Sequence, residues 1–129
     1  MAASRSVIAL TQIAAKAAIN KIGSELIALD LSEQMVLSEV FLIVTAQNEA
    51  QVDAIADGVQ QALAGVGEMP IRREGTAEWI LLDYSDLVVH IQSHALRQYY
   101  MLDHLWNDCP AIALDAVEEF EAHARSAGK

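Results

Sequence analysis

The fold is decided by the stretch Trp79-Ile80-Leu81-Leu82-Asp83-Tyr84-Ser85-Asp86-Leu87-Val88-Val89-His90. Residues 79–83 and 87–91 are two short runs rich in apolar and β-branched side chains, and Tyr84-Ser85 lies between them. Runs of this length and composition, joined by a few polar residues, are typical of an antiparallel hairpin. We therefore expect two paired strands with a turn at Tyr84-Ser85.

Helical and strand patterns alternate along the rest of the chain. The run 40–46 is continuously apolar and β-branched, as in a central strand that is buried on both faces. Asn48 is expected to cap a helix, because Gln51 follows three residues later in a capping-box pattern. The expected elements are a helix at residues 6–22, strands at 25–31 and 40–46, a helix from Asn48 to Gly65, an edge strand at 70–74 with a turn at Gly75-Thr76, the hairpin, and a helix at 94–106 capped by Ser93.

This order of elements predicts an α/β fold with a mixed five-stranded sheet and helices packed on it. Residues 1–110 are expected to form one α/β domain. Residues 111–129 are expected to be an acidic C-terminal extension, partly helical or disordered. The N-terminus lacks a secretory pattern and no apolar run reaches the roughly 20 residues that span a bilayer, so we expect a cytoplasmic protein without membrane contact.

The charge of the chain bears on its partners. Eight Lys and Arg against eighteen Asp and Glu give a formal net charge of −10. Such a surface repels phosphate groups, so little direct contact with nucleic acid is expected, whereas encounter with a basic protein is favoured. The single Cys109 cannot form an internal disulfide and lacks a basic neighbour that would activate its thiol.

Carboxylates and histidines near the hairpin could carry chemistry. Asp83 and Asp86 flank the turn and could bind a divalent cation or act as acid and base. However, aspartates in turns usually accept hydrogen bonds from local backbone N–H groups. His90, His94 and His104 lack the spacing of a zinc motif. We expect no metal, cofactor or catalytic residue, and keep as the alternative a small nucleotidyl- or phosphoryl-transferase that uses Asp83, Asp86 and His90.

Two aromatic residues indicate a binding face. Trp79 starts a strand after a polar loop and Tyr84 lies in a turn, so that burying both inside the domain is difficult to arrange. Aromatic anchors beside carboxylates suit contact with another protein. Tyr99 and Trp106, in contrast, recur at helical spacing with Leu102 and are expected to pack on the sheet.

The hairpin and the helix after it resemble the Iojap family of ribosomal silencing factors, RsfS. The similar residues are the stretch quoted above and Arg97-Gln98-Tyr99-Tyr100-Met101-Leu102-Asp103-His104-Leu105-Trp106, and the likeness extends over about residues 6–110. It implies a nucleotidyltransferase-like core without the active site. It also implies a translation repressor that binds the fourteenth protein of the large ribosomal subunit on the inter-subunit face, blocks joining of the small subunit, and is a homodimer when free.

The residues and the resemblance together define a partner-binding set. Trp79, Leu82 and Tyr84 are expected to be apolar anchors, and Asp83 and Asp86 are expected to face cations of the partner. A dimerisation adaptor, whose aromatic face serves only self-association, is a further alternative.

Three positions depart from the pattern of the family. Glu39 stands where the family often has Asp, Ala50 where it often has Arg, and Ser85 where many members have Gly. With Ala50, this chain lacks that cation at the start of the expected helix. For Ser85 we expect a type I turn, which accommodates a side chain.

Overall fold

The computed structural model describes residues 3–33, 38–100 and 109–119. Its elements are α1 (Arg5–Asn20), β1 (Ser24–Asp30), β2 (Val40–Ala46), α2 (Glu49–Ala64), β3 (Arg72–Thr76), β4 (Trp79–Asp83), β5 (Leu87–Ser93), α3 (His94–Tyr100) and β6 (Ala111–Ile112). The expected continuation of α3 to Trp106, and the packing of Tyr99, Leu102 and Trp106, lie outside the described backbone and side chains.

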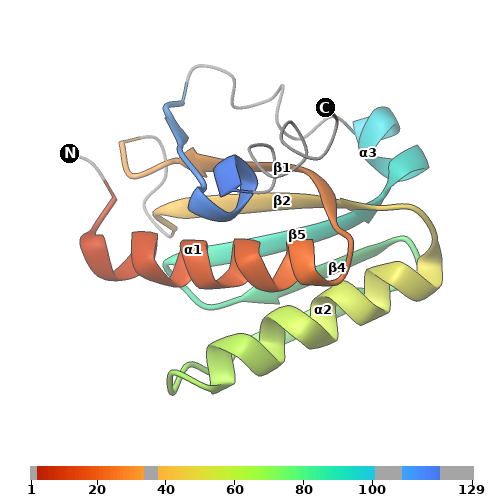
Figure 1. Ribbon diagram of the computed structural model, residues 1–129, viewed down its shortest axis with the longest axis horizontal. Coiled ribbons are helices and arrows are strands. Elements are labelled where there is room, and N and C mark those ends of the chain that lie inside the picture. Colours follow the sequence, from red (N-terminus) through yellow and green to blue (C-terminus); the bar gives the residue numbers. More distant parts are fainter. Residues whose placement is uncertain (1–2, 34–37, 101–108, 120–129) are drawn as a thin grey trace.

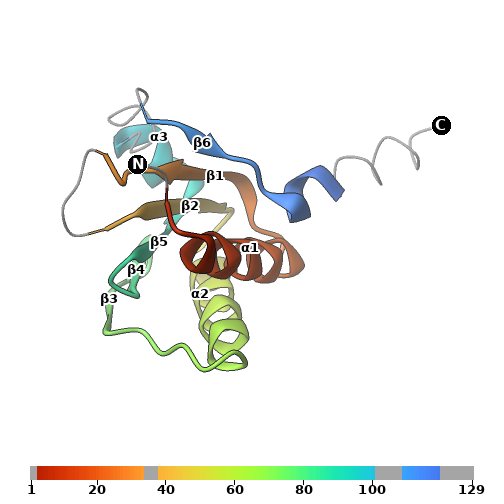
Figure 2. The ribbon, with the colours of Figure 1, turned by 90° about the vertical axis from the view of Figure 1, so that its left-hand side faces the viewer.

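The strands form one mixed sheet in the order β3-β4-β5-β2-β1-β6. β2 and β5 are parallel, and every other neighbouring pair is antiparallel. A parallel pair needs a long crossover connection, and α2 is part of it here. Figures 1 and 2 show α1 and α2 side by side on one face of the sheet. The predicted mixed α/β fold is therefore confirmed.

The sheet has six strands rather than the expected five. β6 is only two residues long and pairs with β1 through Ala28↔Ile112 and Leu29↔Ala111. The side chain of Gln12 in α1 fixes the chain after β6, because its Nε2 donates to the carbonyl oxygen of Ala113 at 2.9 Å and its Oε1 accepts from the N–H of Asp115 at 2.9 Å. Residues 115–119 are helical. So short a strand has no pattern of its own, and tertiary contacts create it.

The predicted start of α2 is confirmed at Asn48. Its Oδ1 accepts a hydrogen bond from the N–H of Gln51 at 2.9 Å. The second half of the expected capping box differs, because Oε1 of Gln51 accepts from the N–H of Gln47 at 2.5 Å and not from that of Asn48. Side chains thus satisfy the N–H of Gln51 in the first turn and the N–H of Gln47 just before the helix.

The prediction of a turn at Gly75-Thr76 is wrong. Both residues belong to β3, and Thr76 pairs with Trp79, so the two-residue turn is Ala77-Glu78. Gly75 has a φ of +90°, and a Cβ at this position would lie 2.1 Å from the carbonyl oxygen of Trp79. Glycine is therefore required at position 75 inside the strand, although in the sequence it resembles a turn signal.

The side chains of β4 alternate between two environments. Ile80 and Leu82 are buried in the main core between the sheet and the two helices. Trp79, Leu81 and Asp83 point to the opposite side and are partly exposed. β2, in contrast, is buried on both sides over most of its length, as expected of a central strand.

The turn between β4 and β5 is held by backbone hydrogen bonds. The N–H of Asp86 donates to the carbonyl oxygen of Tyr84 at 3.0 Å, and the residue between them, Ser85, has a φ of +74°. This combination is a γ-turn, which is strained for a residue with a side chain. The expected type I turn is therefore wrong, and Ser85 occupies a conformation that favours glycine.

Replacing Ser85 by glycine should stabilise the protein. Ser85→Gly relieves a left-handed backbone conformation, so the free energy of unfolding in urea should rise by about 1 kcal/mol. As a control, Ser6→Gly in the first turn of α1 should lower stability, because glycine is a poor helix former. A Ser85→Gly protein that is no more stable than the parent would contradict the strain.

Candidate functional site

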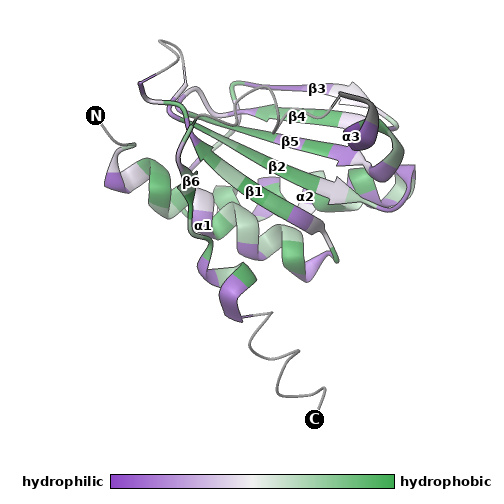
Figure 3. Cartoon of the chain, turned by 90° about the horizontal axis from the view of Figure 1, so that it is seen from above, coloured by the Kyte–Doolittle hydropathy of each residue, from purple (hydrophilic) through white to green (hydrophobic). Residues whose placement is uncertain are grey.

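We define the open face as the side of β3 and β4 that is turned away from α1 and α2. Cross-strand pairing places Arg72 opposite Asp83, Glu74 opposite Leu81, and Thr76 opposite Trp79 on this face. All residues of β3 are exposed. Figure 3 looks onto this side of the sheet, with β3 and β4 along one edge and both long helices behind.

A groove of about 390 Å³ opens on this face next to the β4–β5 turn. Its lining combines apolar side chains with charged and polar groups, a mixture common in binding sites. The lining residues are Ser38, Phe41, Ile71, Arg72, Leu81, Asp83, Ser85, Val88 and His90. Sequence reasoning did not identify Ile71, which is 69% exposed in the structure.

Asp83 is fixed in the groove by two donors. Its Oδ1 accepts from the N–H of Ser85 at 2.8 Å, and its Oδ2 accepts from Nε of Arg72 at 3.2 Å. The first bond links the carboxylate to the strained turn, as expected of an aspartate at a turn. Asp83 therefore presents a positioned negative charge at one end of the open face.

Trp79 and His90 form a pair across β4 and β5. Nε1 of Trp79 donates to Nδ1 of His90 at 3.3 Å, and Phe41 packs edge-on to the His90 ring with centroids 4.7 Å apart. His90 is 5% exposed, and this burial lowers its pKa to about 4. The ring is consequently neutral near pH 7 and acts as an acceptor that orients Trp79.

Tyr84 is half-buried rather than a free surface anchor. Its ring packs against the main core, and its hydroxyl group is buried without a hydrogen-bond partner among the described residues. Burial raises the pKa of the Tyr84 phenol to about 12. The residue can present only part of its ring to a partner.

The expectation that Leu82 is an anchor is wrong. Leu82 is 0% exposed in the core, so it cannot contact a partner in this conformation. Leu81 lies on the open face in its place, in register between Trp79 and Asp83. Alternation along the strand could have identified it, because residues at i and i+2 share a face.

Asp86 is exposed at the tip of the turn. Its carbonyl oxygen accepts from the N–H groups of Glu39 at 2.8 Å and of Val40 at 3.0 Å, which attaches the turn to the start of β2. Asp86 is therefore exposed on a fixed backbone, three residues after Asp83, and is not among the residues that line the groove.

The acid and base groups of the alternative enzyme hypothesis gain no support. Asp83 is occupied by Ser85 and Arg72, and His90 is buried against Trp79. In the part of the chain that the structure describes, no three His, Cys, Asp or Glu residues come together as a metal site.

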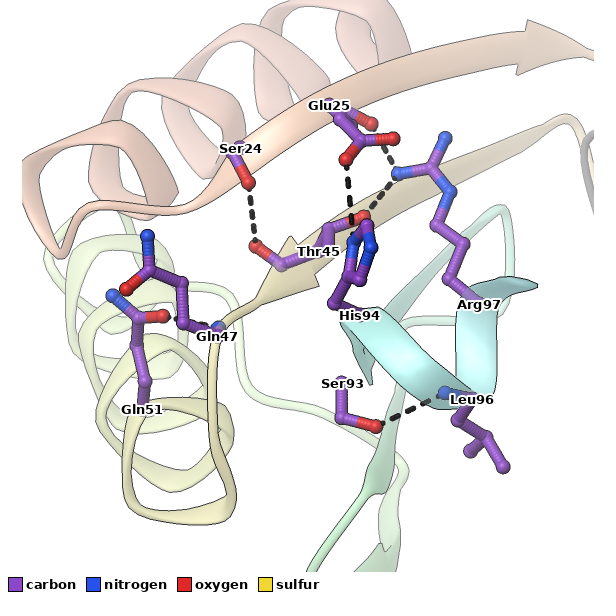
Figure 4. A network of polar contacts seen from close by, with 9 residues as sticks. All are labelled: Ser24, Glu25, Thr45, Gln47, Gln51, Ser93, His94, Leu96 and Arg97. Atoms are coloured by element: carbon purple, nitrogen blue, oxygen red, sulfur yellow. Dashed lines mark hydrogen bonds and ion pairs between the residues drawn. The ribbon is translucent and has the colours of Figure 1, made fainter. Parts of the chain in front are cut away.

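Arg97 has a structural position at the far end of the sheet. Its side chain is 8% exposed, and its Nη1 donates to the carbonyl oxygen of Glu25 and, at 2.7 Å, to Oγ1 of Thr45. Figure 4 shows these contacts together with the cap of α3, in which Oγ of Ser93 accepts from the N–H of Leu96 at 3.2 Å. Arg97 thus ties α3 to β1 and β2.

The burial of His90 should make stability depend on pH. Because the pKa in the folded state is below the ordinary value of 6.5, the unfolded chain takes up the proton first as the pH falls. The contribution to stability is complete above pH 6.5 and is lost progressively toward pH 4. Between pH 7.5 and 5, the parent should lose about 2 kcal/mol more than His90→Asn, whose amide oxygen can still accept from Trp79.

Urea unfolding at both pH values measures this difference. The control is His94→Asn, which removes a histidine from the exposed start of α3 and should leave the steep dependence intact. If parent and His90→Asn lose the same stability, the buried neutral histidine is not the source.

Comparison with known proteins identifies a matching family and several similar sequences. The model of the family described as "Ribosomal silencing factor during starvation", RsfS, matches residues 4–129. The ribosomal silencing factor RsfS of Halalkalibacterium halodurans is 34% identical over 110 residues, which cover 84% of this chain and 94% of the relative. The protein of the same name from Bacillus subtilis is 34% identical over 108 residues, covering 82% and 92%.

A solved structure shows the same architecture. A protein from Chromobacterium violaceum superposes with a TM-score of 0.76 at 32% sequence identity, covering 78% of this chain and 86% of the other. Within the described residues, no helix has both the length and the apolar character needed to cross a membrane. Sequence and structure agree that the chain belongs to the RsfS family of ribosomal silencing factors.

Proposed function

We propose that this protein represses translation by binding the large ribosomal subunit and blocking its joining to the small subunit. The observation that carries the proposal is the open face, where Trp79 and Leu81 lie beside the fixed carboxylate of Asp83 in a member of the RsfS family. Partly exposed apolar groups next to a positioned charge suit a protein interface.

The partner is the fourteenth protein of the large subunit, a basic protein on the inter-subunit face. The net charge of −10 favours encounter with a basic surface and disfavours contact with ribosomal RNA. The contact residues in this proposal are Trp79, Leu81, Asp83, Tyr84 and Asp86, with Leu81 in place of the buried Leu82.

The mechanism is steric and involves no chemical step. A domain bound on the inter-subunit face occupies volume that the small subunit needs, so its presence alone prevents joining. The protein acts in the cytoplasm and is a homodimer when it is not bound, in keeping with the family resemblance. Its activity then depends on the affinity and lifetime of the complex.

Sucrose-gradient profiles test the proposal. Purified protein added to dissociated subunits should co-sediment with the large subunit and lower the amount of joined ribosomes. Asp86→Lys should bind roughly tenfold more weakly, because a reversed charge at the tip of the turn repels a basic partner. Glu119→Lys is the matched control, since it makes the same charge change at an exposed position of the helical residues 115–119 and should retain most binding.

Two results would count against this function. If saturating protein leaves the joined peak unchanged, the protein does not block subunit joining. If Asp86→Lys and Glu119→Lys weaken binding equally, net charge alone determines affinity and the β4–β5 turn is not the contact.

A further inference from the structure

One ion pair on the open face involves the carboxylate that is proposed to meet the partner. Arg72 and Asp83 are direct cross-strand neighbours of β3 and β4. Nε of Arg72 lies 3.2 Å from Oδ2 of Asp83. Because the other oxygen, Oδ1, already accepts from the N–H of Ser85, the arginine occupies the oxygen that is not used by the turn.

The two partners of this ion pair differ in exposure. The side chain of Asp83 is 18% exposed, whereas that of Arg72 is 59% exposed on the outermost strand of the sheet. The carboxylate is therefore the fixed, partly desolvated member and the guanidinium is the solvated one. Exposed ion pairs of this kind contribute little stability, so displacing the arginine requires little energy.

A second carboxylate, that of Glu74, can stay paired with Arg72 when another cation binds Asp83. Nη1 of Arg72 lies 3.1 Å from Oε1 of Glu74, which is two residues away on the same face. Arg72, Asp83 and the exposed side chain of Ile71 also line the groove, which leaves space beside the carboxylate for an incoming side chain.

The neighbouring Arg73 has a structural role, in contrast to Arg72. It points to the opposite face and contacts α2, with Nη1 2.7 Å from Oδ1 of Asp57 and 3.2 Å from Oε1 of Gln60. Arg73 therefore links β3 to the helix. Arg72 pairs instead with Glu74 of its own strand and with Asp83 of β4.

We propose that Arg72 is a specificity-determining residue. It pairs with Asp83 in the free protein, and in the complex a basic side chain of the partner replaces it on Asp83. The inference rests on the proposed function. In the free protein Arg72 neutralises Asp83, so that only a partner cation that is also supported by contacts along the open face displaces it. Arg72 then remains paired with Glu74, and competition at Asp83 discriminates against weakly complementary basic proteins.

Binding to purified large subunits tests the competition. Arg72→Gln should bind about two- to fivefold more tightly than the parent, because the partner no longer competes with an intramolecular cation. Arg72→Lys, which keeps a cation, should lie between the two. The matched control is Lys16→Gln on the exposed surface of α1, which makes the same change in net charge and should alter affinity less than Arg72→Gln does.

A double-mutant cycle with Asp83→Asn assigns the effect to this pair. Asp83→Asn alone should weaken binding, and Arg72→Gln should add no gain in the Asp83→Asn background. The inference is overturned if Arg72→Gln and Arg72→Lys bind no more tightly than the parent, if Lys16→Gln gains as much, or if the gain persists without Asp83. Failure of the parent itself to bind large subunits would instead refute the proposed function, and the inference with it.

Discussion

The parallel pairing of β2 with β5 is the constraint on which the rest of the structure depends. The two strands pair over seven residues, from Val40↔Leu87 to Ala46↔Ser93. Parallel neighbours cannot be joined by a tight turn, so the chain must leave the sheet and return. It does so through α2 and then through β3 and β4, so that β4 pairs with β5 and β3 forms the edge of the sheet.

This arrangement gives the sheet two unequal faces. α1 and α2 cover one face and bury the alternate residues of β4, including Ile80 and Leu82. On the other face, burial decreases from the central strands to the edge: Ile43 is fully buried, Leu81 is partly exposed, and β3 is exposed throughout. The open face is thus a consequence of strand order, and the charged pairs of β3 complete it.

Much of the fold was predictable because its signals are local. Asn48 and Gln51 marked the start of α2, and the apolar run 40–46 marked the central strand. β6 could not be predicted, since two residues carry no periodicity and their pairing depends on β1. Gly75 was misread because the same residue type serves turns and close backbone approaches.

The site was predictable in its location more than in its detail. Residues 79–82 are all apolar or aromatic, so no polar position among them marks the exposed face of the strand. Leu81 could be identified only by its place two residues after Trp79, once Trp79 is taken as exposed. Arg72 was not singled out from the sequence and lies within the expected edge strand at residues 70–74. Its pairing with Asp83 requires the register of β3 on β4, which only the structure supplies.

The central claim, that the open face is the surface covered by the ribosome, is tested most directly by side-chain oxidation footprinting. Ile71 in the groove and Ile22 after α1 are matched probes, at 69% and 70% exposure. On saturation with large subunits, labelling of Ile71 and Trp79 should fall while that of Ile22 stays constant. Protection of Ile22 with unchanged labelling of Ile71 and Trp79 would contradict the account.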